Sequence, residues 1–203
     1  MLNVALTGNV AAGKTAVSKL LSEWGATVLD ADAIVRELQR PGTPVFQQIV
    51  ARFGPGVVAP DGRLDRAALR ARILADPSER QALERIVHPA VQAERSRLLE
   101  HLPRSADDII VSEIPLLFEA ADPAGFDAVV LVDAPEALRV DRLVRERGLA
   151  PLEAAALLRL QLPAGPKRQR ADFSIDNDAS RDLLRERTWA VWRKLRSLAR
   201  NRA

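Results

Sequence analysis

One stretch near the start of the chain limits its possible folds more than any other. Residues 8–15 read Gly-Asn-Val-Ala-Ala-Gly-Lys-Thr, which matches the pattern G-x-x-x-x-G-K-S/T of a phosphate-binding loop. The mostly apolar residues 2–6 before it predict a strand, and the apolar residues at helical spacing after it predict a helix. This order of elements predicts an α/β protein that binds a nucleoside triphosphate. The alternative, a glycine turn beside an exposed lysine, requires all these features to coincide by chance.

The residue types in this loop suit phosphate binding. Glycines let backbone N–H groups close around phosphate oxygens, and the following helix adds its free N–H groups and positive dipole end. The Lys14 ammonium can follow the β- and γ-phosphates, and the Thr15 hydroxyl can occupy one coordination site of Mg²⁺. The predicted nucleotide-binding residues are Gly8, Asn9, Val10, Ala11, Ala12, Gly13, Lys14 and Thr15.

Composition narrows the class of protein further. The 203 residues are 47% hydrophobic and 28% charged, which is ordinary for a soluble globular domain. Cysteine is absent, so a disulfide framework and a cysteine zinc site are both excluded, as suits a cytoplasmic protein. The longest apolar runs are too short to span a bilayer, and we expect no signal peptide or membrane segment. The net charge of +3 suits an anionic substrate without indicating nucleic acid as a partner.

Strand and helix patterns alternate along most of the chain, which predicts a doubly wound, mostly parallel sheet. Predicted strands cover residues 2–6, 26–29, 109–111, 128–132 and 173–175. Predicted helices include residues 135–147, with Asp133 as a possible cap, residues 152–162 and residues 183–198. Between residues 45 and 102 the apolar residues fall at helical spacing only, and Asp76 followed by proline is typical of a helix start. This segment is therefore expected to be a helical insertion that binds a substrate.

Two carboxylates follow the second predicted strand. Side chains alternate along a strand, so Asp30 and Asp32 are expected to point to the same face. Because phosphoryl transfer needs a positioned nucleophile more than covalent catalysis, Asp32 could accept the proton of an attacking hydroxyl. The alternative is that one of the two carboxylates only caps the following helix.

Six further motifs occur in order over nearly the whole chain. They are Val-Leu-Asp-Ala-Asp at 28–32, Pro-Gly-Thr-Pro at 41–44, Asp-Gly-Arg-Leu-Asp-Arg-Ala-Ala-Leu-Arg at 61–70, His-Pro at 88–89, Ile-Pro-Leu-Leu-Phe-Glu at 114–119 and Ala-Asp-Phe-Ser-Ile-Asp-Asn at 171–177. With the phosphate loop, they closely resemble dephospho-coenzyme A kinases. The resemblance implies ATP-dependent, Mg²⁺-assisted phosphorylation of the ribose 3′-hydroxyl of dephospho-coenzyme A, the last step of coenzyme A synthesis.

The resemblance also implies an organisation and an acceptor site. It implies a three-layer α/β/α fold of the P-loop NTPase type with a mostly parallel five-stranded sheet. The expected core comprises residues 1–40, 103–135 and 170–203, with the helical insertion at 41–102 and a mobile lid at 136–169. Asp32 would be the catalytic base, and His88 would belong to the acceptor lobe, although a lone histidine is more often a packing or capping residue and Pro89 is expected to end or start a helix. The acceptor pocket would be lined by Pro115, Leu116, Leu117, Phe118 and Glu119, unless the apolar residues among them belong to the core.

Two residues in the last third of the sequence, Arg142 and Asn177, complete the site that the resemblance implies. Arg142 matches the lid arginine that meets the transferred phosphoryl group, and it would act with Lys14 and Asp32 in catalysis. Arg139 and Arg145 are expected on the same helix face, although basic runs are usually solvated surface. Asn177 matches a residue beside the adenine of ATP, because an amide can both donate and accept; the alternative is an ordinary Asx turn.

Departures from the usual family loop, Gly-Gly-Ile-Gly-Ser-Gly-Lys, lie between Gly8 and Gly13. Asn9 is plausible in place of glycine if the backbone there is left-handed, because asparagine tolerates that conformation. Ala11 would be strained if its φ is positive. In the lid, Glu146 and Leu157 replace frequent arginines, which puts the lid contacts in question.

Two other functions compete with the kinase hypothesis. The arginine-rich C-terminal helix with Trp189 and Trp192 could indicate a nucleic-acid-associated ATPase, although the helical spacing of Trp192 and Leu195 favours packing against the sheet. A degenerate, non-catalytic scaffold is the other, and the intact Lys14, Thr15 and Asp32 disfavour it.

Overall fold

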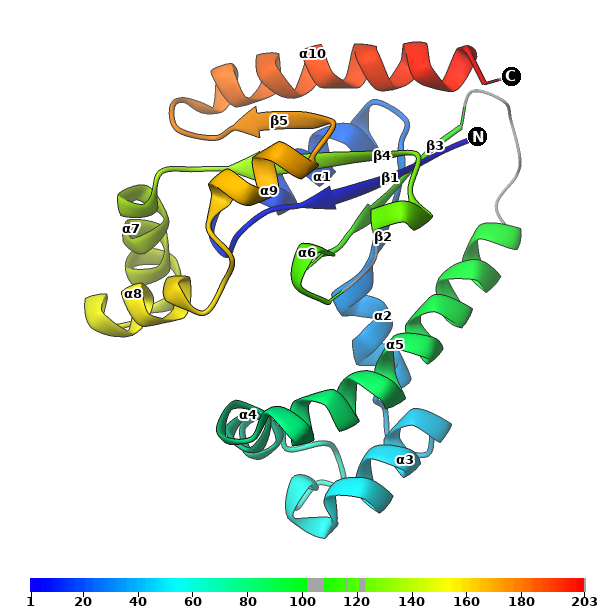
Figure 1. Cartoon of the computed structure of the whole chain (residues 1–203), viewed down its shortest axis with the longest axis vertical. Helices are drawn as coiled ribbons and strands as arrows, with labels where there is room; N and C mark the ends of the chain where they lie inside the picture. Colours follow the sequence, from blue (N-terminus) through cyan, green and yellow to red (C-terminus); the bar gives the residue numbers. More distant parts are fainter. Residues whose placement is uncertain (102–107, 116, 121–122, 203) are drawn as a thin grey trace. The chain divides into compact units, whose positions relative to one another are not determined.

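The computed structural model describes residues 1–101, 108–115, 117–120 and 123–202 (Figure 1). The chain divides into two compact units. One comprises Met1–Asp30 and Arg104–Ala203, and the other comprises Ala31–Pro103. Among the described residues, no helix is both long enough and apolar enough to cross a membrane.

The first unit is built on a five-stranded sheet with the strand order β2-β3-β1-β4-β5. Each neighbouring pair of strands is parallel, which confirms the predicted α/β class. The strands are β1 (Leu2–Thr7), β2 (Thr27–Asp30), β3 (Ile109–Glu113), β4 (Ala128–Asp133) and β5 (Phe173–Asp176). Nearly every residue of β1, β3 and β4 is buried because a parallel sheet is covered on both faces.

Helices cover the two faces of this sheet. On one face, α1 (Lys14–Glu23) and α10 (Arg181–Arg200) pack against alternate residues of β1, such as Val4 and Leu6. On the other face, α6 (Leu117–Ala120) contributes Leu117 and Phe118 to a cluster with Ala5. This alternation along β1 produces the predicted three layers. The C-terminal helix lies along the sheet (Figure 1), and Trp192 on it is 3% exposed.

Three helices fill the segment between β4 and β5: α7 (Glu136–Arg147), α8 (Pro151–Arg159) and α9 (Ala164–Arg170). The prediction that Asp133 caps α7 is wrong, because the N-cap is Pro135 without a side-chain bond. Asp133 instead accepts hydrogen bonds from Ala134 N and from Arg168 Nη2. The sequence did not predict α9, and the helix expected at 152–162 ends earlier, at Arg159.

The second unit is helical, which agrees with the helical spacing predicted between residues 45 and 102, and it also includes residues 31–40, which were expected to belong to the core. Its elements are α2 (Ala31–Leu38), α3 (Pro44–Phe53), the short 3₁₀ turn η1 (Pro55–Val57), α4 (Arg66–Ala75) and α5 (Pro77–Glu100); a second 3₁₀ turn, η2 (Pro123–Gly125), belongs to the first unit. Asp76 caps α5 by accepting from Ser78 N, with Pro77 at the first helical position, as the sequence indicated. Thr43 and Asp65 cap α3 and α4 in the same way.

Pro89 lies inside α5 rather than at a helix end, so that prediction is wrong. An internal proline removes one backbone hydrogen bond and costs about 3 kcal/mol in an isolated helix. Here Val87, Ala90 and Val91, on both sides of the proline, pack into the core of the helical unit with Ile49. Burial of these apolar side chains offsets the lost bond, which sequence spacing alone does not reveal.

Candidate active site

The predicted nucleotide site lies at the carboxyl edge of the sheet. Parallel strands bring their last residues to one edge, and here these are Asp30, Glu113, Thr7, Asp133 and Asp176 in the order of the strands. The phosphate loop follows β1, the middle strand, and leads into α1. In open α/β sheets, ligands bind at this edge.

Gly8 and Gly13, the first and last glycines of the loop, are both required by its geometry. A Cβ at Gly8, whose φ is +152°, would overlap with the carbonyl oxygen of Val132 on β4. Gly13 is the N-cap of α1 with a left-handed φ of 97°, and a Cβ there would overlap with the Asn177 amide. Lys14 Nζ lies over the loop, 2.8 Å from Gly8 O and 3.3 Å from Asn9 O. The loop therefore places the N-terminus of α1 and the Lys14 ammonium close together, a combination that suits binding of an anion.

Ala11 is the one residue other than glycine with a positive φ among the residues that the structure describes, at 59°. This agrees with the expectation of strain at this position, since the left-handed conformation costs about 1–2 kcal/mol for an L-residue. Two contacts hold the conformation. Ala11 O accepts from Arg142 Nη1 at 2.9 Å, and its side chain packs with Val10 against Leu143, Ala154 and Leu158.

Replacing Ala11 with glycine is expected to raise the free energy of unfolding by about 0.5–1 kcal/mol, because relief of the left-handed strain exceeds the added flexibility of the unfolded chain. Urea denaturation measures the change. The matched control is Ala12→Gly, at a fully buried neighbour with an ordinary φ, which is expected to destabilise the protein. A loss of stability in Ala11→Gly equal to that in Ala12→Gly would show that Ala11 is not strained.

Asn9 does not have the left-handed backbone that was expected to explain it, so that interpretation is wrong. Its side chain is instead buried, with 3% of the residue exposed. Asn9 Oδ1 accepts from Lys167 Nζ at 2.6 Å, and Asn9 Nδ2 donates to Leu162 O at 3.2 Å. Next to it, Val10 N donates to Gln161 Oε1 at 2.8 Å. Asparagine at position 9 is therefore explained by the hydrogen bonds of its side chain, and not by its tolerance of a left-handed backbone.

Arg142 and Asn177 both reach the phosphate loop. Arg142, on α7, donates from Nη1 to Ala11 O and from Nη2 to Asn177 O. Asn177 follows β5, and its Nδ2 donates to Ala12 O at 2.8 Å. These bonds fix two loop carbonyls and place a guanidinium beside the loop, while contacts to phosphate and adenine stay predictions.

The other arginines of α7 do not share this position. Arg139 is 6% exposed, and its Nε donates to Ala134 O. Arg145 is exposed and pairs with Asp141 one turn earlier. The expectation that Arg145 lies beside Arg142 is therefore wrong, and solvated surface is the correct interpretation. Glu146 is exposed, and Leu157 packs into the cluster around Leu143 and Leu158.

The segment expected to line the acceptor pocket is only partly accessible. Leu116 lies outside the described residues. Leu117 is fully buried and Phe118 is 8% exposed, with the Arg170 guanidinium 4.6 Å from the Phe118 ring centroid. This favours the alternative that both belong to the core. Pro115 is half-buried, and its carbonyl lies 3.5 Å from Thr7 Oγ1.

Asp30 and Asp32 do not follow one strand, which corrects the alternation argument. Asp30 ends β2, and Asp32 is already in the first turn of α2, because the helix begins at Ala31. A carboxylate there is favoured by the positive end of the helix dipole. His88 is exposed on α5. Both Asp32 and His88 belong to the helical unit.

Lys167, Gln161 and Arg168 were missed by the sequence analysis. Arg168 bonds Asp133 at 2.9 Å and Asp176 at 2.5 Å, joining the ends of β4 and β5, and its hydrogen bonds to Asp176 and then to Asp133 raise the pKa of the Arg168 guanidinium. One signal pointed to Lys167: it is one of four lysines among 30 basic residues. A lysine supplies a compact ammonium rather than a planar guanidinium, but this rarity marks the four lysines equally and does not single out Lys167.

The donor groups near the loop fit Mg²⁺ that arrives with a nucleotide. Thr15 offers a hydroxyl at the start of α1, and Asp30 and Glu113 are register partners at the ends of β2 and β3. Oxygen ligands of this kind suit Mg²⁺, which keeps several water and phosphate ligands. No group of three or more potential side-chain ligands is found within the described ranges, so the nucleotide would supply most of the coordination.

A parallel sheet with a phosphate loop after its middle strand, which leads directly into a helix, defines a P-loop protein that binds a nucleoside triphosphate. The sequence profile described as dephospho-CoA kinase matches residues 2–182, and the chain belongs to the dephospho-CoA kinase family.

Individual relatives agree with this assignment. The chain is 48% identical over 190 residues to the dephospho-CoA kinase of Symbiobacterium thermophilum, covering 94% of this chain and 80% of the relative. It is 44% identical over 195 residues to the dephospho-CoA kinase of Streptomyces avermitilis, covering 96% and 94%. The crystal structure of TT1252 from Thermus thermophilus superposes with a TM-score of 0.82 at 35% identity, covering 95% and 96%.

Proposed function

We propose that this protein transfers the γ-phosphoryl group of ATP to the ribose 3′-hydroxyl of dephospho-coenzyme A, giving coenzyme A and ADP, the last step of coenzyme A synthesis. The observation that supports this most directly is the family match over residues 2–182. That range includes the phosphate loop, Asp32 and Asn177. A cytoplasmic location and small-molecule partners belong to the same proposal.

The donor half of the reaction uses the loop. The β- and γ-phosphates accept from loop N–H groups at the start of α1, and Lys14 neutralises charge on them. Arg142 donates to Ala11 O in the loop, and in this proposal its guanidinium turns to the γ-phosphoryl group when ATP binds. Mg²⁺ bound with ATP would neutralise charge on the β- and γ-oxygens, and Thr15 would hold it.

The acceptor half uses the helical unit. The acceptor 3′-oxygen attacks the γ-phosphorus, the bond from that phosphorus to the β–γ bridging oxygen breaks, and the hydroxyl proton passes to the Asp32 carboxylate. His88 contributes to acceptor binding, as do Pro115 and Glu119 after β3. The boundaries proposed for the insertion, 41–102, and for the lid, 136–169, belong to this hypothesis.

ADP is expected to form rapidly when ATP and dephospho-coenzyme A are both present, and slowly with nucleoside monophosphates as acceptors. A coupled assay for ADP measures both rates, and a reaction without acceptor is the control. Equal ADP formation with and without dephospho-coenzyme A, or stimulation by DNA or RNA alone, would contradict the proposal.

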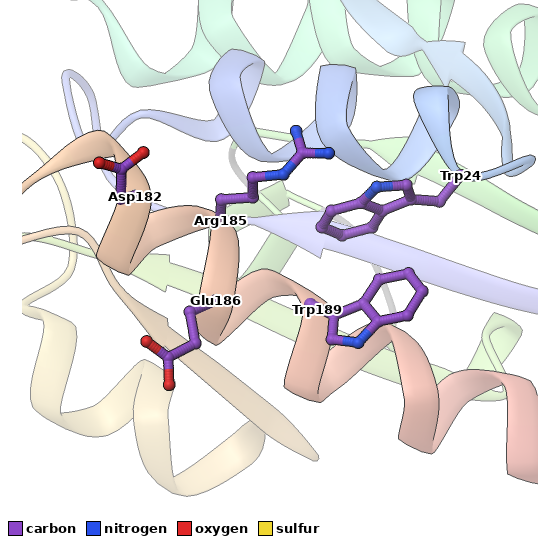
Figure 2. Close-up of a pocket in the computed structure, with 5 residues that line it drawn as sticks. All are labelled: Trp24, Asp182, Arg185, Glu186 and Trp189. Atoms are coloured by element: carbon purple, nitrogen blue, oxygen red, sulfur yellow. The ribbon is translucent and has the colours of Figure 1, made fainter.

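The tryptophans of α10 give no support to nucleic-acid binding. Trp192 is buried in the core between α10 and the sheet. Trp189 packs edge to face on Trp24, with ring centroids 4.9 Å apart, in a pocket that Asp182, Arg185 and Glu186 also line (Figure 2). Two carboxylates at the rim disfavour a phosphate backbone. Trp192 is explained by packing of α10 against the sheet, and Trp189, although 44% exposed, packs on Trp24 at the end of α1.

A further inference from the structure

Lys167 on α9 is buried although it is charged. Its residue exposure is 1%, and its ammonium makes two short hydrogen bonds, to Asn9 Oδ1 at 2.6 Å and to Glu119 Oε1 at 2.5 Å. Asn9 belongs to the phosphate loop, and Glu119 belongs to α6, the short helix that follows β3. One ammonium therefore joins three segments that are far apart in the sequence.

Two further bonds close this contact into a ring. Asn9 Nδ2 donates to Leu162 O, and Leu162 N donates to Glu119 Oε1 at 3.3 Å. Asn9, Lys167, Glu119 and Leu162 thus satisfy one another, and both polar atoms of the Asn9 amide are engaged. Burial of Lys167 makes this arrangement demanding, because a buried ammonium that loses its partners keeps the full cost of its desolvation.

The side chain of Asn9 gives the loop this connection. Family loops commonly have glycine at this position, and glycine has no side chain to accept from Lys167. Since Asn9 lies between Gly8 and Val10, fixing its side chain restrains the backbone that surrounds the phosphates. On the other side of the ammonium, Glu119 is held in the segment proposed to contact the acceptor.

We propose that Lys167 is a positioning residue that holds the phosphate loop in its nucleotide-binding conformation through Asn9. Through Glu119, it also connects the loop to α6. The proposal deepens the kinase function proposed above and rests on it only for the acceptor side. Lys167 touches neither reacting atom in this scheme; it acts through Asn9. Its removal is therefore expected to weaken nucleotide binding more than it slows the chemical step.

The test is a double-mutant cycle on nucleotide binding, measured by titration calorimetry with ADP. Lys167→Met and Asn9→Gly are each expected to weaken ADP binding by about five- to tenfold, in keeping with loss of a hydrogen bond to a charged group. The double variant is expected to bind ADP less weakly than the product of the two single effects, because both changes break the same Lys167–Asn9 bond. Lys167→Arg is expected to recover part of the affinity. Lys194→Met, the same change at an exposed lysine of α10, is the matched control and should leave ADP binding unchanged.

Steady-state kinetics separates positioning from loss of folded protein. Partial unfolding lowers kcat and leaves the KM for ATP unchanged, whereas the proposed role raises the KM for ATP with little change in kcat. Unchanged ADP affinity in Lys167→Met, or independent and multiplicative effects in the double variant, would overturn the proposal. Asn9→Gly leaves Lys167 paired with Glu119, so it keeps the test valid if Lys167→Met does not fold. Calorimetry with ADP needs no acceptor, so failure of the kinase hypothesis would appear only in the ADP-formation assay.

Discussion

Replacing Asp32 with asparagine is expected to lower kcat by about a hundredfold or more while ATP still binds, which is the usual contribution of a general base. Asparagine has nearly the same shape as aspartate, but its amide cannot take the proton of the acceptor hydroxyl. Asp32 is exposed in the first turn of α2, so the fold is expected to persist with either residue there.

Single-turnover rates with dephospho-coenzyme A, together with ADP affinity, measure this effect. Asp30→Asn is the comparison variant, because Asp30 ends β2 two residues earlier and is a candidate Mg²⁺ ligand rather than the base, so a smaller loss of turnover is expected. Near-normal turnover in Asp32→Asn would remove Asp32 from the mechanism. A larger loss in Asp30→Asn than in Asp32→Asn would transfer the role to Asp30.

Replacing Gly8 with alanine is expected to destabilise the protein by about 3 kcal/mol and to lower its melting temperature by about 6–12 °C. The added methyl group would meet the backbone carbonyl of Val132 on β4, and a backbone atom in a central strand cannot move aside as a flexible side chain can. Nucleotide binding is expected to be lost as the loop shifts away from β4.

Thermal unfolding and ADP calorimetry measure the two effects. Gly25→Ala separates steric overlap from backbone conformation, because Gly25 also has a positive φ, +101°, yet no atom lies within 4 Å of a Cβ placed there. It is expected to cost about 1 kcal/mol. Equal losses of stability in the two variants would show that contact with Val132 is unimportant.

The sheet and the phosphate loop could be predicted from the sequence because their determinants are local. Each strand of a parallel sheet is a short, almost uninterrupted apolar run, as in Ala128–Asp133, and such runs stand out beside helical spacing. The loop pattern depends on glycine and lysine at fixed offsets. The order of strands and helices then leaves few possible topologies.

The parts that could not be predicted depend on partners distant in the sequence. Asn9 and Lys167 are 158 residues apart, and neither residue indicates the other. Leu117 of α6 is buried because it packs against Ala5 on β1 and Val129 on β4. Pro89 remains within α5 because of packing by residues from several helices. Asp32 was misplaced for a local reason, since β2 ends at Asp30, two residues before Asp32, and the helix begins at Ala31.

The apolar residues of the phosphate loop have a consequence for its motion. Val10 and Ala11 pack with Leu143, Ala154 and Leu158, so the loop shares a small hydrophobic core with α7 and α8. Segments that share a core open together as one cooperative unit. We therefore expect the phosphate loop to open together with α7 and α8, so that apolar packing around Leu143 contributes to how long the predicted nucleotide site stays assembled.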